Sequence, residues 1–366
     1  MMRFTTTLLA AIVSMANVAY GDETQPAPDD RVSIAIERSL RLLESTSAAT
    51  AEQRKCFTCH GQAMPVIALV EARKRGFSID ESNLELQLDH TDAHLRRGRK
   101  SYLDGKGQGG GVDTAGYALW TLEAGGRSRD ETISSVLQYL VSVNSKLGYW
   151  KCKSDRPPSE SSHFTTTYLA LRAIHYFGDT TPAEEERISK ASAWLHSAKP
   201  VTTEDKVFHL RSLHYLSAEE SVLATQADSL VDSQRDDGGW AQKDDMESDA
   251  YATASVLVAL LRCGHPASDH TVFERGLAYL LDRQAKDGSW RVETRSKPFQ
   301  KYFESSFPYA EDQFISASAT AWSTLALLLS LPAEDGNGEP LGSNAKQSQT
   351  AKSSHTGEYT DTDERH

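Results

Sequence analysis

Residues 234–240 read Gln-Arg-Asp-Asp-Gly-Gly-Trp, and residues 284–290 read Gln-Ala-Lys-Asp-Gly-Ser-Trp. Both fit Gln-x-x-Asp-Gly-x-Trp, and four matching positions that recur about fifty residues apart mark a chain built from repeated supersecondary units. The Asp-Gly pair predicts a tight turn in which glycine takes a positive φ. We expect the indole N–H to need a partner. The Gln side chain is expected to stack on the indole and bond to the terminus of the next helix, which joins one helix pair to its neighbour. Residues 144–150 keep the Gly and the Trp of this pattern but lose the Gln and the Asp.

Helical patterns alternate in character along the chain. The first member of each pair carries charges on one face, as in residues 184–190, which is typical of an exposed outer helix. The second member is rich in Ala, Thr, Ser and Leu, as in residues 251–260, and small residues favour close packing in an inner ring. The predicted segments are 32–43, 63–73, 84–102, 114–124, 132–143, 165–177, 183–198, 206–216, 219–233, 250–263, 272–283 and 316–331. The pairing predicts an all-α fold, an (α/α)6 barrel or α-α toroid of six outer and six inner helices.

The repeated segment resembles the QW repeat of squalene/hopene cyclases, in the terpenoid cyclase and protein prenyltransferase superfamily. The resemblance covers about residues 30 to 332 and speaks for the fold more than for the chemistry. Hopene-type cyclases carry an acid motif, Asp-x-Asp-Asp-Thr-Ala, at the start of an inner helix. Residues 249–254 read Asp-Ala-Tyr-Ala-Thr-Ala, so Asp249 is kept and Tyr251 replaces the acid. A phenol near its ordinary pKa does not protonate an alkene. We therefore expect an apolar or isoprenoid-like ligand in the barrel mouth, without the standard cyclase acid.

The loops that lead into the inner helices are expected to line a cavity at one end of the barrel. The loop within residues 150–165 places Asp155, Arg156, Glu160 and His163 around two prolines. It is either a substrate-binding or acid/base loop, or an exposed loop whose charges pair locally.

A second loop, residues 297–313, holds five aromatic residues and three carboxylates. The aromatic residues either wall an apolar or sugar-binding cavity or plug the barrel end. For the apolar cavity the predicted lining is Tyr251, Phe299, Phe303 and Phe307. Glu304 and Asp312 are candidate catalytic carboxylates. Paired with Asp155 or Glu160 across the mouth, they would suit an alternative function, a periplasmic glycan hydrolase or lyase on an α/α barrel.

Residues 56–60 read Cys-Phe-Thr-Cys-His, the attachment sequence of a c-type haem. Cys56 and Cys59 would bond the vinyl groups, and His60 would ligate the iron. A c-type haem-binding redox protein is therefore a further alternative. The same residues also suit a tight disulfide, or a metal half-site that includes His60.

The termini and the overall charge suggest where the protein acts. Residues 1–21 combine a positive start, a short apolar run and a small-residue cleavage site, which predicts a secretory signal peptide and a periplasmic or secreted protein. Residues 22–332 form one predicted domain, and the polar residues 333–366 a disordered tail. We expect no integral membrane segment once the signal is removed. The formal net charge is −12 with scattered basic residues, which argues against nucleic acid as a partner.

Overall fold

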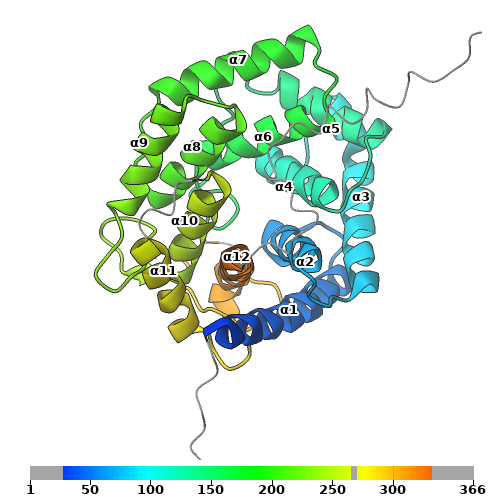
Figure 1. Ribbon diagram of the computed structural model, residues 1–366. Helices are drawn as coiled ribbons and strands as arrows, with labels where there is room; N and C mark the ends of the chain where they lie inside the picture. The colour runs from blue at the N-terminus through cyan, green and yellow to red at the C-terminus, as the bar shows by residue number, and fades with distance from the viewer. Residues whose placement is uncertain (1–27, 265–269, 300, 332–366) are drawn as a thin grey trace, which may run out of the picture.

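The structure is a computed structural model, and it describes residues 28–264, 270–299 and 301–331. The predicted signal segment, 1–21, and the predicted tail, 333–366, lie outside the described residues. The outer helices are α1 (Pro28–Gln53), α3 (Glu81–Leu103), α5 (Glu131–Ser142), α7 (Pro182–Ser197), α9 (Glu220–Val231) and α11 (His270–Arg283). The inner helices are α2 (Met64–Lys74), α4 (Gly111–Ala124), α6 (His163–Phe177), α8 (Thr203–Tyr215), α10 (Ala250–Arg262) and α12 (Gln313–Ser330). Figure 1 shows the outer set surrounding the inner set, so the predicted α/α barrel is confirmed.

The inner helices form a closed ring. Each packs against the next, and α12 packs against α2 as well as α10. The ring is tight because its helices are buried almost all round: every residue from 250 to 260 on α10 is buried. Small side chains at these positions allow the close approach that the sequence predicts. In the described part of the chain no helix is long and apolar enough to cross a membrane.

Three tryptophans fix the helix pairs in the same way. Trp150, Trp240 and Trp290 are fully buried, and each indole N–H donates to a carbonyl ten residues earlier, at 2.8 Å in all three cases. The backbone N–H of each Trp donates to a threonine hydroxyl on the following inner helix; the acceptors are Thr167, Thr253 and Thr320. The segment around Trp150 is therefore a third copy of the repeat in structure.

The glutamines of the repeat bond to the next outer helix, as predicted. Gln234 Nε2 donates to Val272 O in the first turn of α11 at 2.9 Å. Gln284 Nε2 donates to Ala35 O on α1 at 2.8 Å, which joins the last outer helix to the first. The turns between Gln and Trp need glycine: Gly288 has a φ of +91°, and a Cβ there would lie 2.5 Å from the α1 backbone.

An arginine takes the place of the glutamine in the third copy. Arg187 lies on α7, in the charged run that suggested an exposed face, yet it is only 3% exposed. Its guanidinium lies 3.7 Å from the centre of the Trp150 ring and donates to Leu147 O at 3.0 Å. The prediction of a fully solvated face on α7 is thus wrong at Arg187, because the loop before Trp150 offers it backbone carbonyls.

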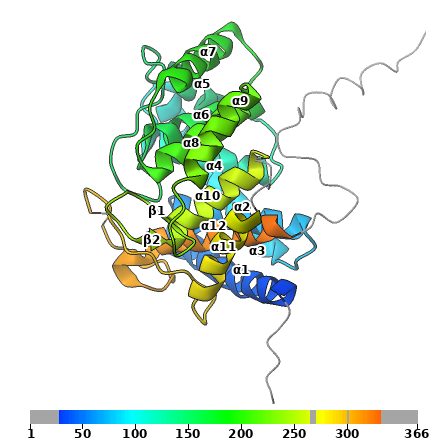
Figure 2. The same cartoon turned by 60° about the vertical axis from the view of Figure 1, so that its left-hand side comes forward.

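The barrel has two different ends. Figure 2 shows β1 (Trp240–Ala241), β2 (Ser248–Asp249) and the long segment before α12 on one side of the ring, where the inner helices begin. The two strands pair antiparallel. A π-helix, η1 (Cys59–Ala63), leads into α2, and a 3-10 turn, η3 (Ala310–Asp312), leads into α12. The inner helices finish at the opposite end.

Candidate functional site

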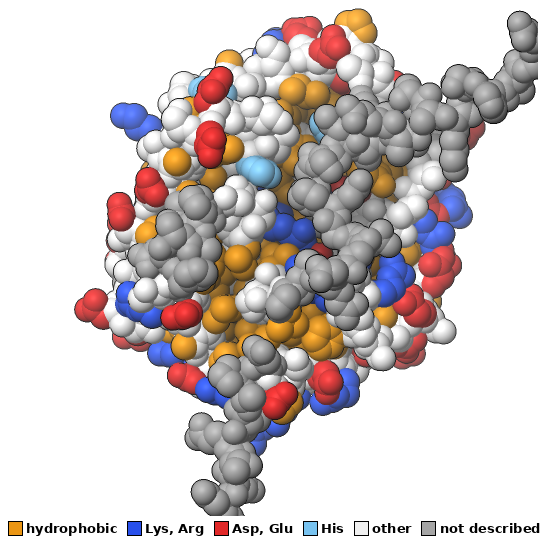
Figure 3. All heavy atoms as spheres, viewed as in Figure 1, with side chains coloured by type: hydrophobic (Ala, Val, Ile, Leu, Met, Phe, Trp, Pro, Cys, Tyr) orange, Lys and Arg blue, Asp and Glu red, His pale blue; other side chains and the backbone are white. Residues whose placement is uncertain are grey.

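A central cavity of about 370 Å³ opens where the inner helices finish, and all six of them line it. This volume falls within the range of small-molecule sites, about 300–1,000 Å³. Figure 3 shows the hollow in the middle of the ring, with hydrophobic side chains around it and basic side chains within it. The ring of inner helices thus encloses a pocket of mixed apolar and cationic character.

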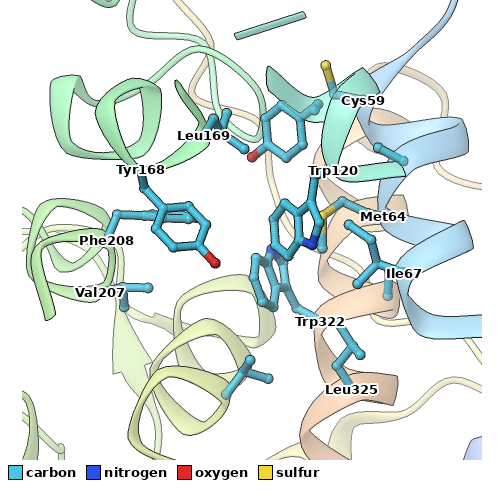
Figure 4. Close-up of a cluster of buried hydrophobic side chains, with 14 of the residues drawn as sticks. Cys59, Met64, Ile67, Trp120, Tyr168, Leu169, Val207, Phe208, Trp322 and Leu325 are labelled. Carbon is cyan, nitrogen blue, oxygen red and sulfur yellow. The ribbon is translucent and has the colours of Figure 1, made fainter. Parts of the chain in front are cut away.

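The deepest layer of the cavity is mainly aromatic and aliphatic. Each inner helix contributes one residue to it, the cavity-lining residue nearest the start of that helix. These residues are Ile67, Trp120, Tyr168, Arg211, Val258 and Trp322. Figure 4 shows Trp120 and Trp322 together, facing Tyr168 and Phe208. The ring centres of Trp120 and Trp322 are 6.3 Å apart, and those of Trp120 and Tyr168 are 5.8 Å apart. Offset and edge contacts of this kind make a rigid apolar wall.

Arg211 is the charged member of that layer. It is 7% exposed, and its guanidinium lies 4.5–5.3 Å from the ring centres of Tyr168, Trp120, Phe208 and Trp322. Nη2 donates to the Tyr168 hydroxyl at 2.9 Å, whereas Nη1 is buried and has no hydrogen-bond partner. Burial lowers the pKa of Arg211 from its ordinary value. The aromatic faces stabilise the positive charge, but they supply no oxygen acceptor for Nη1.

The outer layer of the cavity is charged and internally paired. Arg172 makes two 2.6 Å hydrogen bonds to the carboxylate of Glu123. Arg262 pairs with Glu71 at 2.7 Å, and Glu71 also accepts from Arg75. These carboxylates are about nine-tenths buried, so each neutralises a guanidinium at the cavity wall.

The opposite end of the barrel is covered by the two loops that the sequence singled out. Asp155 and Lys297 form an antiparallel bridge, and Ser296 donates to Pro157 O at 3.0 Å. The two loops thus pack on each other across the starts of the inner helices. A hollow of about 450 Å³ does lie at this end, but to the side of the ring, where His163 of the first loop lines it together with Trp194 and Asp205. None of Tyr251, Phe299, Phe303 and Phe307 lines the central cavity, and Phe299 is 53% exposed.

The charged residues of the first loop are all engaged, some within the loop and some outside it. Arg156 donates to Glu160 at 2.6 Å, and His163 Nδ1 accepts from the backbone of Cys152 at 3.0 Å. Asp155 instead accepts from Arg295 at 2.5 Å and from Lys243 at 3.2 Å, two cations of distant segments, and these cations lower the pKa of Asp155 below its ordinary value against the effect of burial. The local-pairing alternative therefore describes Arg156 and Glu160 but not Asp155.

Asp249 has a structural role at the start of α10. It caps the helix by accepting from Ala252 N and also accepts from Gln242, both at 2.9 Å. In the other two copies the equivalent positions, four residues before the Trp-bonding threonine, are His163 and Ser316, and both accept from the backbone two residues after the Trp. Asp249 therefore matches a position that orders the repeat.

Tyr251 belongs to a buried acidic cluster under the loops. Its hydroxyl donates to Glu204 at 2.7 Å, and Thr165 also donates to Glu204 at 2.7 Å. Asp113, at the start of α4, accepts from Thr166 at 2.6 Å. Burial raises the pKa of Asp113 and of Glu204, and repulsion from the carboxyls of Glu160 and Glu204 raises the pKa of Asp113 further. Neither acid lines the central cavity.

The remaining candidate carboxylates do not meet across a mouth. Glu304 is held in its own turn, where it accepts from Tyr302 and from Ser306 N at 2.7 Å. Asp312 pairs with Arg291 at 3.0 Å and accepts from Thr294 N at 2.9 Å. Neither Glu304 nor Asp312 is among the residues that line the cavity.

The Cys-x-x-Cys-His segment forms the loop before η1 and the start of η1 itself. Cys56 and Cys59 are free thiols, so the structure does not contain the tight disulfide. His60 is 4% exposed, burial lowers its pKa to about 3, and neither ring nitrogen has a partner. The described residues contain no group of three or more metal-ligating side chains. The imidazole ring centre lies 4.4 Å from that of Phe314 and 6.1 Å from that of Phe303, so a porphyrin does not fit beside His60 in this conformation.

Comparisons with known proteins agree with the fold. Residues 202–339 match the squalene-hopene cyclase C-terminal domain. A stretch of 62 residues is 40% identical to drimenyl diphosphate synthase from Streptomyces showdoensis and spans 17% of this chain and 11% of that enzyme. The type II terpene cyclase MstE from Scytonema, with merosterolic acid A as product, has a TM-score of 0.54 at 14% identity over 82% of this chain and 97% of that chain.

A glycosidase in complex with glucose has the same fold, with a TM-score of 0.51 at 12% identity over 81% of this chain and 98% of that chain. At such identities the solved structures show the fold alone, and proteins of this fold perform different chemistry. By fold, and by the sequence of residues 202–339, the chain is similar to the squalene cyclase-like proteins of the terpenoid cyclase superfamily.

Proposed function

We propose that this protein binds an apolar, isoprenoid-like molecule in the central cavity. The observation that supports it is the deep layer, where Trp120, Trp322 and Tyr168 form an enclosed aromatic wall. Pockets of this kind bury most of the surface of a small ligand. A branched hydrocarbon chain fits such a wall because its burial needs no hydrogen bonds, and burial contributes about 25 cal/mol per Å² of apolar area.

The cavity supports binding more directly than it supports cyclisation. An alkene-protonating enzyme needs an acid with a raised pKa beside its ligand, and two such acids, Asp113 and Glu204, lie at the other end of the barrel, under the loops. Burial also raises the pKa of Glu123 in the cavity wall, but both of its carboxylate oxygens accept from Arg172. The candidate carboxylates of a glycan hydrolase are bonded to neighbours and do not line the cavity. We also propose, from residues 1–21 alone, that the protein acts in the periplasm or as a secreted protein.

Extraction of the purified protein with organic solvent, followed by mass spectrometry, tests the binding function. We expect an isoprenoid-like molecule that co-purifies in near-stoichiometric amount, and calorimetric binding of a C15 isoprenoid alcohol to protein stripped of lipid. Ile67→Trp places an indole in the deep layer and should abolish both. Ile34→Trp makes the same change at a position that is 40% exposed on α1 and should abolish neither. An empty extract together with no binding of the alcohol would overturn the proposal.

A second candidate function rests on His60. Two unpartnered ring nitrogens in a buried side chain are costly, at about 1–3 kcal/mol for a buried polar group, and axial ligation of a haem iron would relieve that cost. Attachment through Cys56 and Cys59 would require both Phe303 and the closer Phe314, on α12, to move off His60. A pyridine haemochrome assay on protein from a host competent in cytochrome c assembly tests this. Cys56→Ser should reduce haem content and Cys152→Ser should not; colourless wild-type protein removes the candidate.

A further inference from the structure

We propose that the cavity recognises the carboxylate head of an amphipathic isoprenoid acid through Arg211 and Tyr168. The inference rests on the proposed binding function and names the chemical class of the ligand. It starts from the one cation of the deep layer: Arg211 is more than nine-tenths buried, lines the cavity, and has an Nη1 group without an acceptor. A buried charged donor without an acceptor is costly unless a ligand supplies one.

Tyr168 supplies the second donor. Its hydroxyl accepts from Arg211 Nη2 at 2.9 Å and from Arg172 Nη1 at 3.0 Å. A hydroxyl has two acceptor lone pairs and one O–H donor, so both lone pairs are used and the hydrogen remains. Nothing in the described part of the chain accepts that O–H. The buried Arg211 Nη1 and the Tyr168 O–H are thus two donors on residues that line the floor of the pocket, a number suited to the two oxygens of one carboxylate.

The other arginines of the cavity are already paired with carboxylates, which is why we assign a single negative charge to the head group of the ligand. Arg172 donates to Glu123 through Nε and Nη2 and to Tyr168 through Nη1, and Arg262 donates to Glu71. Lys74 lies exposed at the rim. A diphosphate head has more charge and more acceptor atoms than one guanidinium and one hydroxyl satisfy. The apolar body of the ligand would lie above the floor, against Trp120 and Trp322.

Three C15 isoprenoids that differ only at the head provide the test: the carboxylic acid, the alcohol and the hydrocarbon. Quenching of tryptophan fluorescence measures their affinities for lipid-free protein, because Trp120 and Trp322 line the cavity. We expect the acid to bind at least about ten-fold more tightly than the alcohol, in line with a charge-assisted hydrogen bond in a buried site. The preference should persist at high salt, since a buried pair is screened little.

Three variants distinguish specific binding of the carboxylate by Arg211 and Tyr168 from nonspecific electrostatic attraction to the cavity. Arg211→Gln should weaken binding of the acid about 10- to 100-fold and leave the alcohol within about threefold. Tyr168→Phe keeps the ring and should weaken the acid about three- to ten-fold. Lys74→Gln removes a cation at the rim and should preserve the preference. Equal affinity of the wild-type protein for the acid and the alcohol would overturn the carboxylate inference but not the proposed binding function. This comparison needs no variant, so it holds even if Arg211→Gln does not fold. Failure of all three compounds to bind overturns the proposed function as well.

Discussion

Gln284→Ala removes the hydrogen bonds that close the outer ring. The Gln284 amide donates to Ala35 O on α1 at 2.8 Å and to Gly288 O at 3.2 Å. A typical intramolecular hydrogen bond contributes a net of about 0.5–1.5 kcal/mol, so the pair contributes about 1–3 kcal/mol. Release of the side chain returns rotamer entropy that offsets part of the upper end of this range. We expect a loss of about 1–2 kcal/mol in the free energy of unfolding.

Urea denaturation followed by circular dichroism measures that loss, and thermal denaturation should show a fall in Tm of about 2–3 °C, since a barrel of this size unfolds with a large entropy. Hydrogen exchange should accelerate first in the early turns of α1, because the lost bond holds that helix. Gln138→Ala is the matched control: Gln138 lies exposed on α5, its side chain makes no hydrogen bond to the described residues, and its loss should change stability by less than about 0.5 kcal/mol. Equal effects of the two substitutions would refute the role given to the repeat.

Three further predictions concern buried charge and backbone geometry. Burial raises the pKa of Asp113, so the contribution of Asp113 to stability is full below the unfolded pKa near 4 and falls as pH rises toward the folded pKa, by about 1.4 kcal/mol per pH unit. Asp113→Asn should therefore reduce the decline with pH, above pH 4, of the free energy of unfolding measured in urea. An unchanged decline would contradict this. Glu123→Gln leaves the Arg172 guanidinium buried without its carboxylate and should cost about 3 kcal/mol by thermal denaturation, with a loss below about 1 kcal/mol counting against the pair. Gly288→Ala forces a Cβ to 2.5 Å from the α1 backbone at a φ of +91°, so calorimetry should show at least about 2 kcal/mol of destabilisation; a neutral result would mean that the turn relaxes freely.

The sequence predicted the helices and the repeat because both depend on local patterns. Periodicity and small-residue content separate outer from inner helices, and the Gln, Gly and Trp of residues 234–240 and 284–290 have fixed geometric tasks. The third copy of the repeat matched the sequence pattern less well because the residue that replaces its glutamine, Arg187, lies on another helix. The residues around Trp150 therefore do not reveal this partner.

The position of the cavity did not follow from the sequence. A loop rich in polar and aromatic residues before an inner helix has the same sequence pattern whether it lines an opening or folds across the barrel. The bridge between Asp155 and Lys297, which joins the two loops across the barrel end, is visible only in the structure. Trp120, Arg211 and Trp322 lie within inner helices, where they are indistinguishable from core residues until the ring closes. Asp113 and Glu204 lie in the first turns of helices, a common place for solvated acids, so the sequence gives no sign of their burial.

The bond between Gln284 and α1 has a consequence for synthesis. Helix α1 cannot complete its contacts until residues beyond 284 have followed it from the ribosome, and at about 5–20 residues per second that takes on the order of 10–50 s. During this interval the apolar stripe of Ile36, Leu40 and Leu43, which is buried in the finished ring, lacks the part of its cover that α11 and α12 supply. The nascent chain therefore offers α1 as a chaperone-binding segment, and termination before α12 leaves that segment incompletely covered.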